Sequence, residues 1–157
     1  MRETLEGFVG WPPELAERYS ATGLWEGLTV DAMVERSARR RPDKTALVAG
    51  EQRLSYAELV ARSRALAARL AALGLRAGER VLMQLPNSVE FVLAYLALNR
   101  LGAIPVMALR AHRHAEVRHF LRASGAVAYL VPDIVGGFDF RAMAAQMLKY
   151  WLQGRHE

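Results

Sequence analysis

The chain contains no cysteine among its 157 residues, which excludes a disulfide framework and any metal site built on thiolates. It also lacks a long uninterrupted apolar run. The most membrane-like segment, residues 91–109, is broken by Asn99, Arg100 and Pro105, so it fits a buried helix and strand better than a membrane span. Residues 1–6 carry two acids and no apolar core, so no secretory signal is expected. These features predict a cytoplasmic protein without a membrane partner.

Acidic residues are in the minority, and the net charge is +5. Nineteen of the 21 basic residues are arginine, and they are scattered along predicted helices beside alanine. The one dense run, residues 39–41, closes a predicted helix, where cations complement the helix dipole. No recognised nucleic-acid module or aromatic platform accompanies the charge. We therefore expect no nucleic-acid partner, and keep a basic nucleic-acid binder as the alternative that binding at low salt would test.

Residues 78–107 predict a strand–helix–strand unit. An apolar run at 81–85 is followed by Ser88, which can cap a helix whose apolar residues recur at helical spacing. Gly102 ends that helix, and a second apolar run follows at 104–107. Neither run alternates with polar residues, so we expect both faces of both strands to be covered. The unit is typical of an α/β protein with a largely parallel sheet and flanking helices.

The remaining segments complete a single domain, as the length suggests. Residues 1–28 form a loop-rich arm around one short helix, with Trp11 and Trp25 expected to pack on the domain surface. Leucines 59, 66, 70 and 73 are expected to form the apolar stripe of a helix that starts at a capping box, Ser55 to Glu58. Helices are predicted at 14–20, 30–40, 55–73, 116–123 and from Asp139 onward, and further strands at 45–49, 53–54 and 127–131.

Three groups of residues could carry chemistry. His112, His114 and His119 suggest a metal site, but only Glu116 lies nearby and zinc needs three or four ligands. A solvated loop and helix start is therefore the preferred interpretation, with His156 far along the chain. Gly136 and its neighbour Gly137 could cradle a phosphate in a loop, but no lysine, serine or threonine follows at useful spacing.

Ser88 occupies a turn where α/β sheets often bind ligands, but a simple helix cap is the preferred interpretation of this residue. A nucleophile elbow and a dinucleotide fingerprint are both absent from the sequence. The residues thus predict a fold and no catalytic apparatus: no catalytic, cofactor-binding or metal-binding residue is expected.

Several ordered segments resemble the acyl-adenylate-forming (AMP-binding) ligases. Leu-Ser-Tyr-Ala-Glu-Leu at 54–59 resembles the first core motif of these enzymes, and residues 99–106 resemble the second. The match is closer still to the aryl-acid branch, the 2,3-dihydroxybenzoate–AMP and salicylate–AMP ligases of siderophore biosynthesis. Segments 42–47 and 85–91 also fit the order and spacing of the general family, and the segments that carry the resemblance to the aryl-acid branch are 10–12, Tyr19 with 23–25, 108–113 with Glu116, 132–133 and 137–141.

This resemblance implies the N-terminal subdomain of the adenylating-enzyme fold, incomplete within residues 1–157 because the family chain is several times longer. The full enzyme would use ATP and Mg²⁺ to form an aryl adenylate, then pass the aryl group to the phosphopantetheine thiol of a carrier protein. Its phosphate-gripping loop, aryl pocket, ribose-binding aspartate and catalytic lysine lie beyond the matched region. Lys44 and Lys149, the only lysines, do not occupy such motifs.

We therefore expect an N-terminal fragment or one half of a split ligase, inactive alone and binding no cofactor by itself. The alternative is a non-enzymatic module that associates with a ligase remainder, a carrier protein or a second copy of itself. The sequence departs from the family at Arg110, where proline is commoner, so the resemblance does not predict that loop's shape. It departs again after Leu148, in a divergent tail at 149–157.

Overall fold

The computed structural model describes the backbone of residues 9–153 and the side chains of residues 9–149. The elements in chain order are α1 (Pro13–Ala21), α2 (Val30–Arg40), β1 (Thr45–Ala49), β2 (Gln52–Ser55), α3 (Tyr56–Ala72), β3 (Arg80–Met83), α4 (Val89–Leu101), β4 (Ile104–Met107), α5 (His114–Ser124), β5 (Ala128–Leu130), β6 (Ile134–Val135), β7 (Phe138–Asp139) and α6 (Phe140–Gln153).

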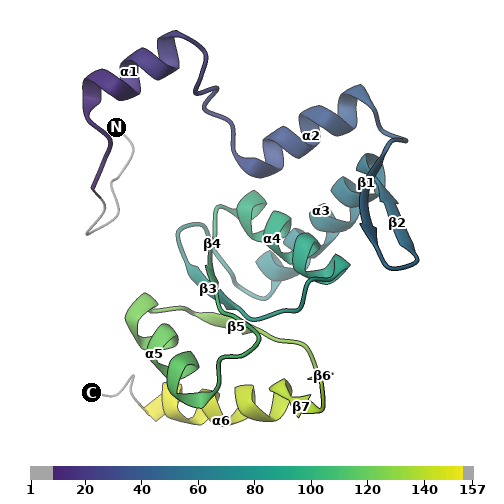
Figure 1. The fold of residues 1–157 in the computed structure, drawn as a ribbon. Coiled ribbons are helices and arrows are strands. Elements are labelled where there is room, and N and C mark those ends of the chain that lie inside the picture. The colour runs from purple at the N-terminus through teal and green to yellow at the C-terminus, as the bar shows by residue number, and fades with distance from the viewer. Residues whose placement is uncertain (1–8, 154–157) are drawn as a thin grey trace.

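A parallel sheet of three strands, in the order β4-β3-β5, lies at the centre of the fold. Helices α3 and α4 lie on one side of it, and α5 and α6 lie on the other (Figure 1). The predicted α/β class, with a strand–helix–strand unit at its centre, is confirmed. None of the helices within residues 9–153 is long and apolar enough to cross a membrane.

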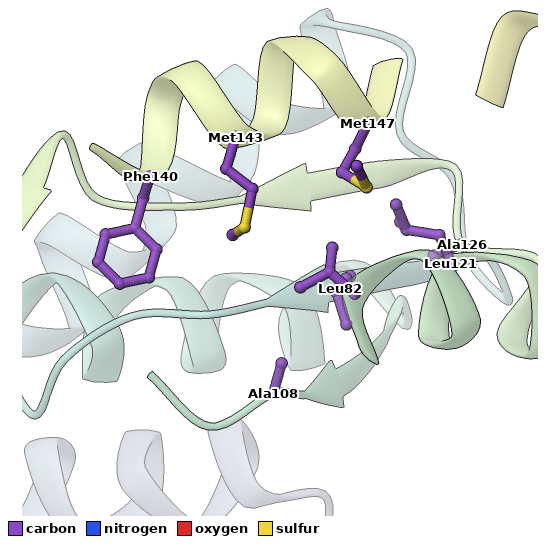
Figure 2. Close-up of a cluster of buried hydrophobic side chains, with 8 residues drawn as sticks. Leu82, Ala108, Leu121, Ala126, Phe140, Met143 and Met147 are labelled. Atoms are coloured by element: carbon purple, nitrogen blue, oxygen red, sulfur yellow. The ribbon is translucent and has the colours of Figure 1, made fainter. Parts of the chain in front are cut away.

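Strand β3 supplies both halves of the core because its alternate residues point to opposite faces. Leu82 packs with residues of α5 and α6, while Val81 and Met83 pack with Ala94 and Leu98 of α4. All three β3 side chains are almost completely buried. Figure 2 shows Leu82 beneath the side chains that α6 projects toward the sheet, which are Phe140, Met143 and Met147.

The prediction that both central strands are covered on both faces holds for β3 and is wrong for β4. Met107 is 49% exposed, and the other residues of β4 are only partly buried. The reason is position, because β4 forms an edge of the sheet. An apolar run in the sequence marks a strand of the core, but it does not distinguish a central strand from an edge strand.

Helix α3 begins as predicted, with a capping box in which the Ser55 amide donates to Glu58 and the Glu58 amide donates to the Ser55 hydroxyl. Its apolar stripe includes Leu59, Leu66 and Leu70. Leu73 was also expected there, but it is 84% exposed. This residue is the C-cap, where the helical repeat that keeps one face on the core has ended.

The C-terminal region differs from the sequence prediction in two places. Residues 135–138, expected to be a loop, lie within the short antiparallel hairpin β6–β7. Gly136 and Gly137 make its turn with φ of +58° and +75°, the backbone conformation that a two-residue hairpin turn requires. Helix α5 starts at His114 instead of Glu116. Asp139 caps α6 as predicted, since its carboxylate accepts from the Ala142 amide at 2.8 Å.

Ion pairs connect α2 to the helices beneath it. The Glu35 carboxylate accepts from Arg100 at 2.6 Å and from Arg64 at 2.7 Å, which links α2 to both α3 and α4. Hydrogen bonds from Arg64, the larger effect, and from Arg100 lower the pKa of Glu35 below its ordinary value of 4.5. The ionised Glu35 carboxylate therefore stabilises the fold at any pH above the ordinary pKa of 4.5. This stabilisation is lost as the pH falls through the lowered pKa of the folded state.

We predict that Glu35→Gln lowers the free energy of unfolding at pH 7, because Arg64 and Arg100 both lose their ion pair with Glu35, and Arg100 keeps only its longer pair with Asp31. The difference from the unsubstituted chain should shrink as pH falls below 4.5. Urea unfolding across a pH series measures it. Glu51→Gln, at an exposed turn residue without an ion pair among the described residues, is the matched control. A difference that stays constant with pH would contradict this account of Glu35.

Candidate functional site

The carboxyl ends of β3, β4 and β5 lie at one edge of the sheet because the three strands are parallel. Segments 84–88, 108–113 and 131–133 follow these ends and therefore converge there. Ligands of α/β proteins commonly bind at this edge. It is the candidate functional site of this chain.

Gln84, directly after β3, connects its own segment to the loop at 108–113 and to strand β5. Its side chain is fully buried, and Nε2 donates to the carbonyls of Leu109 at 2.7 Å and His112 at 3.0 Å. Its Oε1 accepts from the Tyr129 hydroxyl. Burial raises the pKa of Tyr129, so this hydroxyl keeps its proton and donates at neutral pH. All hydrogen-bonding groups of the Gln84 amide are thus used inside the protein, as a buried polar group requires.

The loop at 108–113 has a defined shape in spite of its departure from the family at Arg110. The His112 Nδ1 accepts from the Leu109 amide at 3.0 Å, and the Arg113 guanidinium donates to the Arg110 carbonyl at 2.7 Å. The same guanidinium lies 4.0 Å from the ring centroid of Phe138, a cation–π contact. Side-chain bonds to the backbone, together with Gln84, therefore determine the loop's conformation.

A cleft of about 540 Å³ opens between the turn after β3 and the loop after β4. Its walls are largely apolar, and Asn87 and Arg110 provide the polar groups. This lining suits an apolar or aromatic group with an anionic end, and it offers no nucleophile paired with a base. The lining residues are Leu85, Pro86, Asn87, Phe91, Met107, Ala108, Leu109 and Arg110.

The three histidines that suggested a metal site contact other side chains of the protein. The His112 ring lies edge-on to Phe120 at 5.0 Å, and His114 Nε2 hydrogen-bonds to Gln146 of α6 at 2.8 Å. His119 also lies against Phe120, at 6.0 Å. Within residues 9–153, no three histidine or acidic side chains are grouped so as to hold a metal ion, and His156 lies outside the described residues.

The other candidate residues are engaged in local structure. The Ser88 hydroxyl accepts from the Phe91 amide at 3.3 Å, which makes it the cap of α4. Glu116 accepts from the Arg113 amide at 2.9 Å, and this bond lowers the pKa of its carboxyl. Gly136 and Gly137 form the hairpin turn described above. The structure brings none of them together with the cleft except Ser88, whose neighbour Asn87 lines it.

The sequence analysis missed Gln84 and Tyr129. A signal for Gln84 was available, since it is the one polar residue in the apolar run at 81–85, and a polar residue at a buried strand position requires partners. Tyr129 could not be paired with it from the sequence, because the two residues lie 45 positions apart and only the adjacency of β3 and β5 brings them together.

The sequence profile of the AMP-binding enzyme family matches residues 34–153. The chain belongs to this family. The salicyl-AMP ligase / salicyl-S-ArCP synthetase of Mycobacterium tuberculosis H37Rv is 46% identical over 149 residues, covering 92% of this chain and 26% of the relative. The 2,3-dihydroxybenzoate-AMP ligase of Bacillus subtilis is 43% identical over 143 residues, covering 91% and 26%. The resemblance to the aryl-acid branch is confirmed.

Solved structures of the AMP-binding family agree with this fold. The apo structure of Mycobacterium smegmatis MbtA matches with a TM-score of 0.83 and 41% identity over 91% of this chain and 26% of that chain. The N-terminal subdomain of Klebsiella oxytoca NpsA, in complex with 3-hydroxybenzoyl-AMSN, matches with a TM-score of 0.65 and 28% identity over 71% and 29%. The chain spans about a quarter of the length of these relatives and has the fold of their N-terminal subdomain.

We predict that Gln84→Leu destabilises the chain by about 2–3 kcal/mol, because it leaves two carbonyls and the Tyr129 hydroxyl without their buried partner. Amide hydrogen exchange in segment 109–113 should accelerate at the same time. Urea unfolding and exchange measured by mass spectrometry check both effects.

Gln52→Leu, the same substitution at an exposed residue of β2, should leave segment 109–113 unchanged. Unaltered exchange in this segment in the Gln84→Leu variant would show that Gln84 does not determine the loop's conformation.

Proposed function

We propose that this chain provides the N-terminal subdomain of an aryl-acid–AMP ligase of siderophore biosynthesis. The observation that carries the proposal is the identity of 46% and 43% with a salicyl-AMP ligase and a 2,3-dihydroxybenzoate-AMP ligase, along more than nine-tenths of this chain. Residues 1–157 would then form one incomplete subdomain, with an arm at 1–28 and the sheet as its centre.

The proposed reaction of the whole ligase has two steps. A carboxylate oxygen of salicylate or 2,3-dihydroxybenzoate attacks the α-phosphorus of ATP, and the bond to pyrophosphate breaks. The thiol sulfur of a carrier protein's phosphopantetheine then attacks the acyl carbon, and AMP leaves. A carrier partner is supported by the solved NpsA-ThdA protein, an artificially fused adenylation–PCP di-domain. We place this reaction in the cytoplasm, where ATP is available.

Residues 9–153 do not fit an ATP-phosphate or Mg²⁺ site. Among them no group of three or more histidine or acidic side chains could hold a metal ion, and the paired glycines form a hairpin turn with open space around them. We therefore assign no reaction step to these residues. Their proposed role is to hold the sheet edge and the loop at 108–113 in place for groups contributed from outside the matched region.

A second candidate is a non-enzymatic interaction module. It is favoured by the free edge of β5 in the described sheet and by the apolar groove of about 410 Å³ beside it, between β5 and α6. Unpaired strand edges and apolar grooves are common sites of association. The same surface would also suit contact with the remaining polypeptide of a ligase. The two candidates therefore differ in whether a ligase assembled with this chain is catalytically active.

We predict that the isolated chain gives no ATP–pyrophosphate exchange with salicylate or 2,3-dihydroxybenzoate, since the groups for adenylation are absent from it. A chimera in which residues 9–148 replace the aligned segment of the M. tuberculosis salicyl-AMP ligase should give salicylate-dependent exchange. The parent ligase and a reaction without aryl acid are the controls.

Exchange by the isolated chain would refute our assignment of catalysis to other segments. A chimera that unfolds cooperatively yet shows no salicylate-dependent exchange would contradict the proposed function and favour the interaction module.

A further inference from the structure

The described part of the N-terminal arm, residues 9–28, has its own aromatic cluster. The Trp25 ring centroid lies 5.6 Å from that of Trp11 and 5.3 Å from that of Tyr19. The Trp25 amide donates to the Tyr19 carbonyl at 3.0 Å, which folds the segment after α1 back onto that helix. The expected packing of Trp11 and Trp25 on the domain surface is therefore wrong: they pack on each other and on Tyr19.

Two contacts join this arm to α2. Glu26 forms an ion pair with Arg36, and the Thr29 hydroxyl accepts from the Ala32 amide at 3.4 Å as the helix cap. The ion pair and the cap direct the chain from the arm into α2. The arm is a preorganised structure attached to the domain at one end.

The rest of the arm is strongly exposed. Helix α1 contains no buried residue, and none of the extensive packing contacts among the described elements involves it. Figure 1 shows α1 set apart from the helices and strands that surround the sheet. Trp11 is 64% exposed and Leu24 is 71% exposed. We define the arm surface as the exposed apolar side chains Trp11, Leu24, Trp25 and Leu28 of the arm together with Val30 and Met33 at the start of α2.

Monomeric proteins rarely expose large contiguous apolar patches, and such patches commonly mark interaction sites. Tryptophan is also the residue type most enriched among those that dominate binding energy. Since the aromatic cluster already orders the arm, docking would cost little conformational entropy. The six side chains of the arm surface carry no charge, so the complementary surface should be apolar as well.

Relatives of this chain share sequence with the arm and contain further polypeptide. The profile of the whole family starts at residue 34, beyond the arm. The alignment with the M. tuberculosis salicyl-AMP ligase, by contrast, covers 92% of this chain, so it must include part of the first 33 residues. That relative shares sequence with the arm. The part of the relative outside the matched segment is about three times as long as the matched segment itself.

We propose that the arm surface docks against an apolar surface on the remaining polypeptide of an aryl-acid ligase, and so joins this subdomain to the rest of the enzyme. The inference rests on the proposed function, because that function supplies the remaining polypeptide.

Paired thermal unfolding of the isolated chain and of the M. tuberculosis chimera, extended to include residues 1–148, tests the proposal. Leu24→Ser removes an exposed arm side chain outside the aromatic cluster. It should lower the unfolding midpoint of the chimera by about 2–4 °C and leave that of the isolated chain unchanged. Leu73→Ser, at a residue 84% exposed at the end of α3, is the matched control and should change neither midpoint.

Hydrogen exchange gives a second measurement that does not depend on how the chimera unfolds. The amides of residues 21–30 should exchange more slowly in the chimera than in the isolated chain. If the chimera does not fold, the comparison is made with the isolated chain mixed with the separately produced remainder of the ligase.

Equal exchange of these amides in the free and the joined chain overturns the proposal. So does an effect of Leu24→Ser on both midpoints, which would show a role within the subdomain. A dimer of the isolated chain that Leu24→Ser dissociates, measured by light scattering, would assign the surface to a second copy instead. Salicylate-dependent ATP–pyrophosphate exchange by the chimera tests the proposed function separately. The arm can dock in a chimera that shows no exchange, and exchange can occur in a chimera whose arm does not dock.

Discussion

The buried strand β3 is the element on which the rest of this structure depends. Its side chains point alternately to the two helical layers. Both layers therefore pack against the same short strand, from opposite faces. Its two ends bind the neighbouring segments. Arg80 donates to the carbonyls of Ser124 at 2.7 Å and Gly125 at 3.2 Å, and so neutralises the end of α5. A Cβ at Gly125 would lie 2.8 Å from this guanidinium, and its φ of +60° also favours glycine.

Gln84 performs the equivalent task at the other end of β3, where it binds the loop after β4 and the tyrosine of β5. The candidate site thus consists of polar bonds that position backbone, beside a largely apolar cleft. The chain belongs to the AMP-binding family and spans about a quarter of the length of its relatives.

Apolar surface left without cover is the second feature that shapes the interpretation. It occurs at the arm, at the β4 edge near Met107 and beside β5. Some of the charged residues pair within the subdomain, as in the Glu35 network that joins α2 to α3 and α4. Exposed apolar surface of this kind commonly marks a site where a protein contacts other polypeptide.

The sequence by itself determined the elements whose signals are local. The capping box at Ser55, the Thr29, Ser88 and Asp139 caps and the α/β pattern of 78–107 depend on residues within a few positions of each other, and the ordered motifs sufficed to identify the family. Tertiary structure alone decided which strand lies at the centre, and hence why β3 is buried while Met107 of β4 is half exposed. It also decided the Gln84–Tyr129 bond and the separation of the arm from the domain, because each depends on contacts between residues distant in the chain.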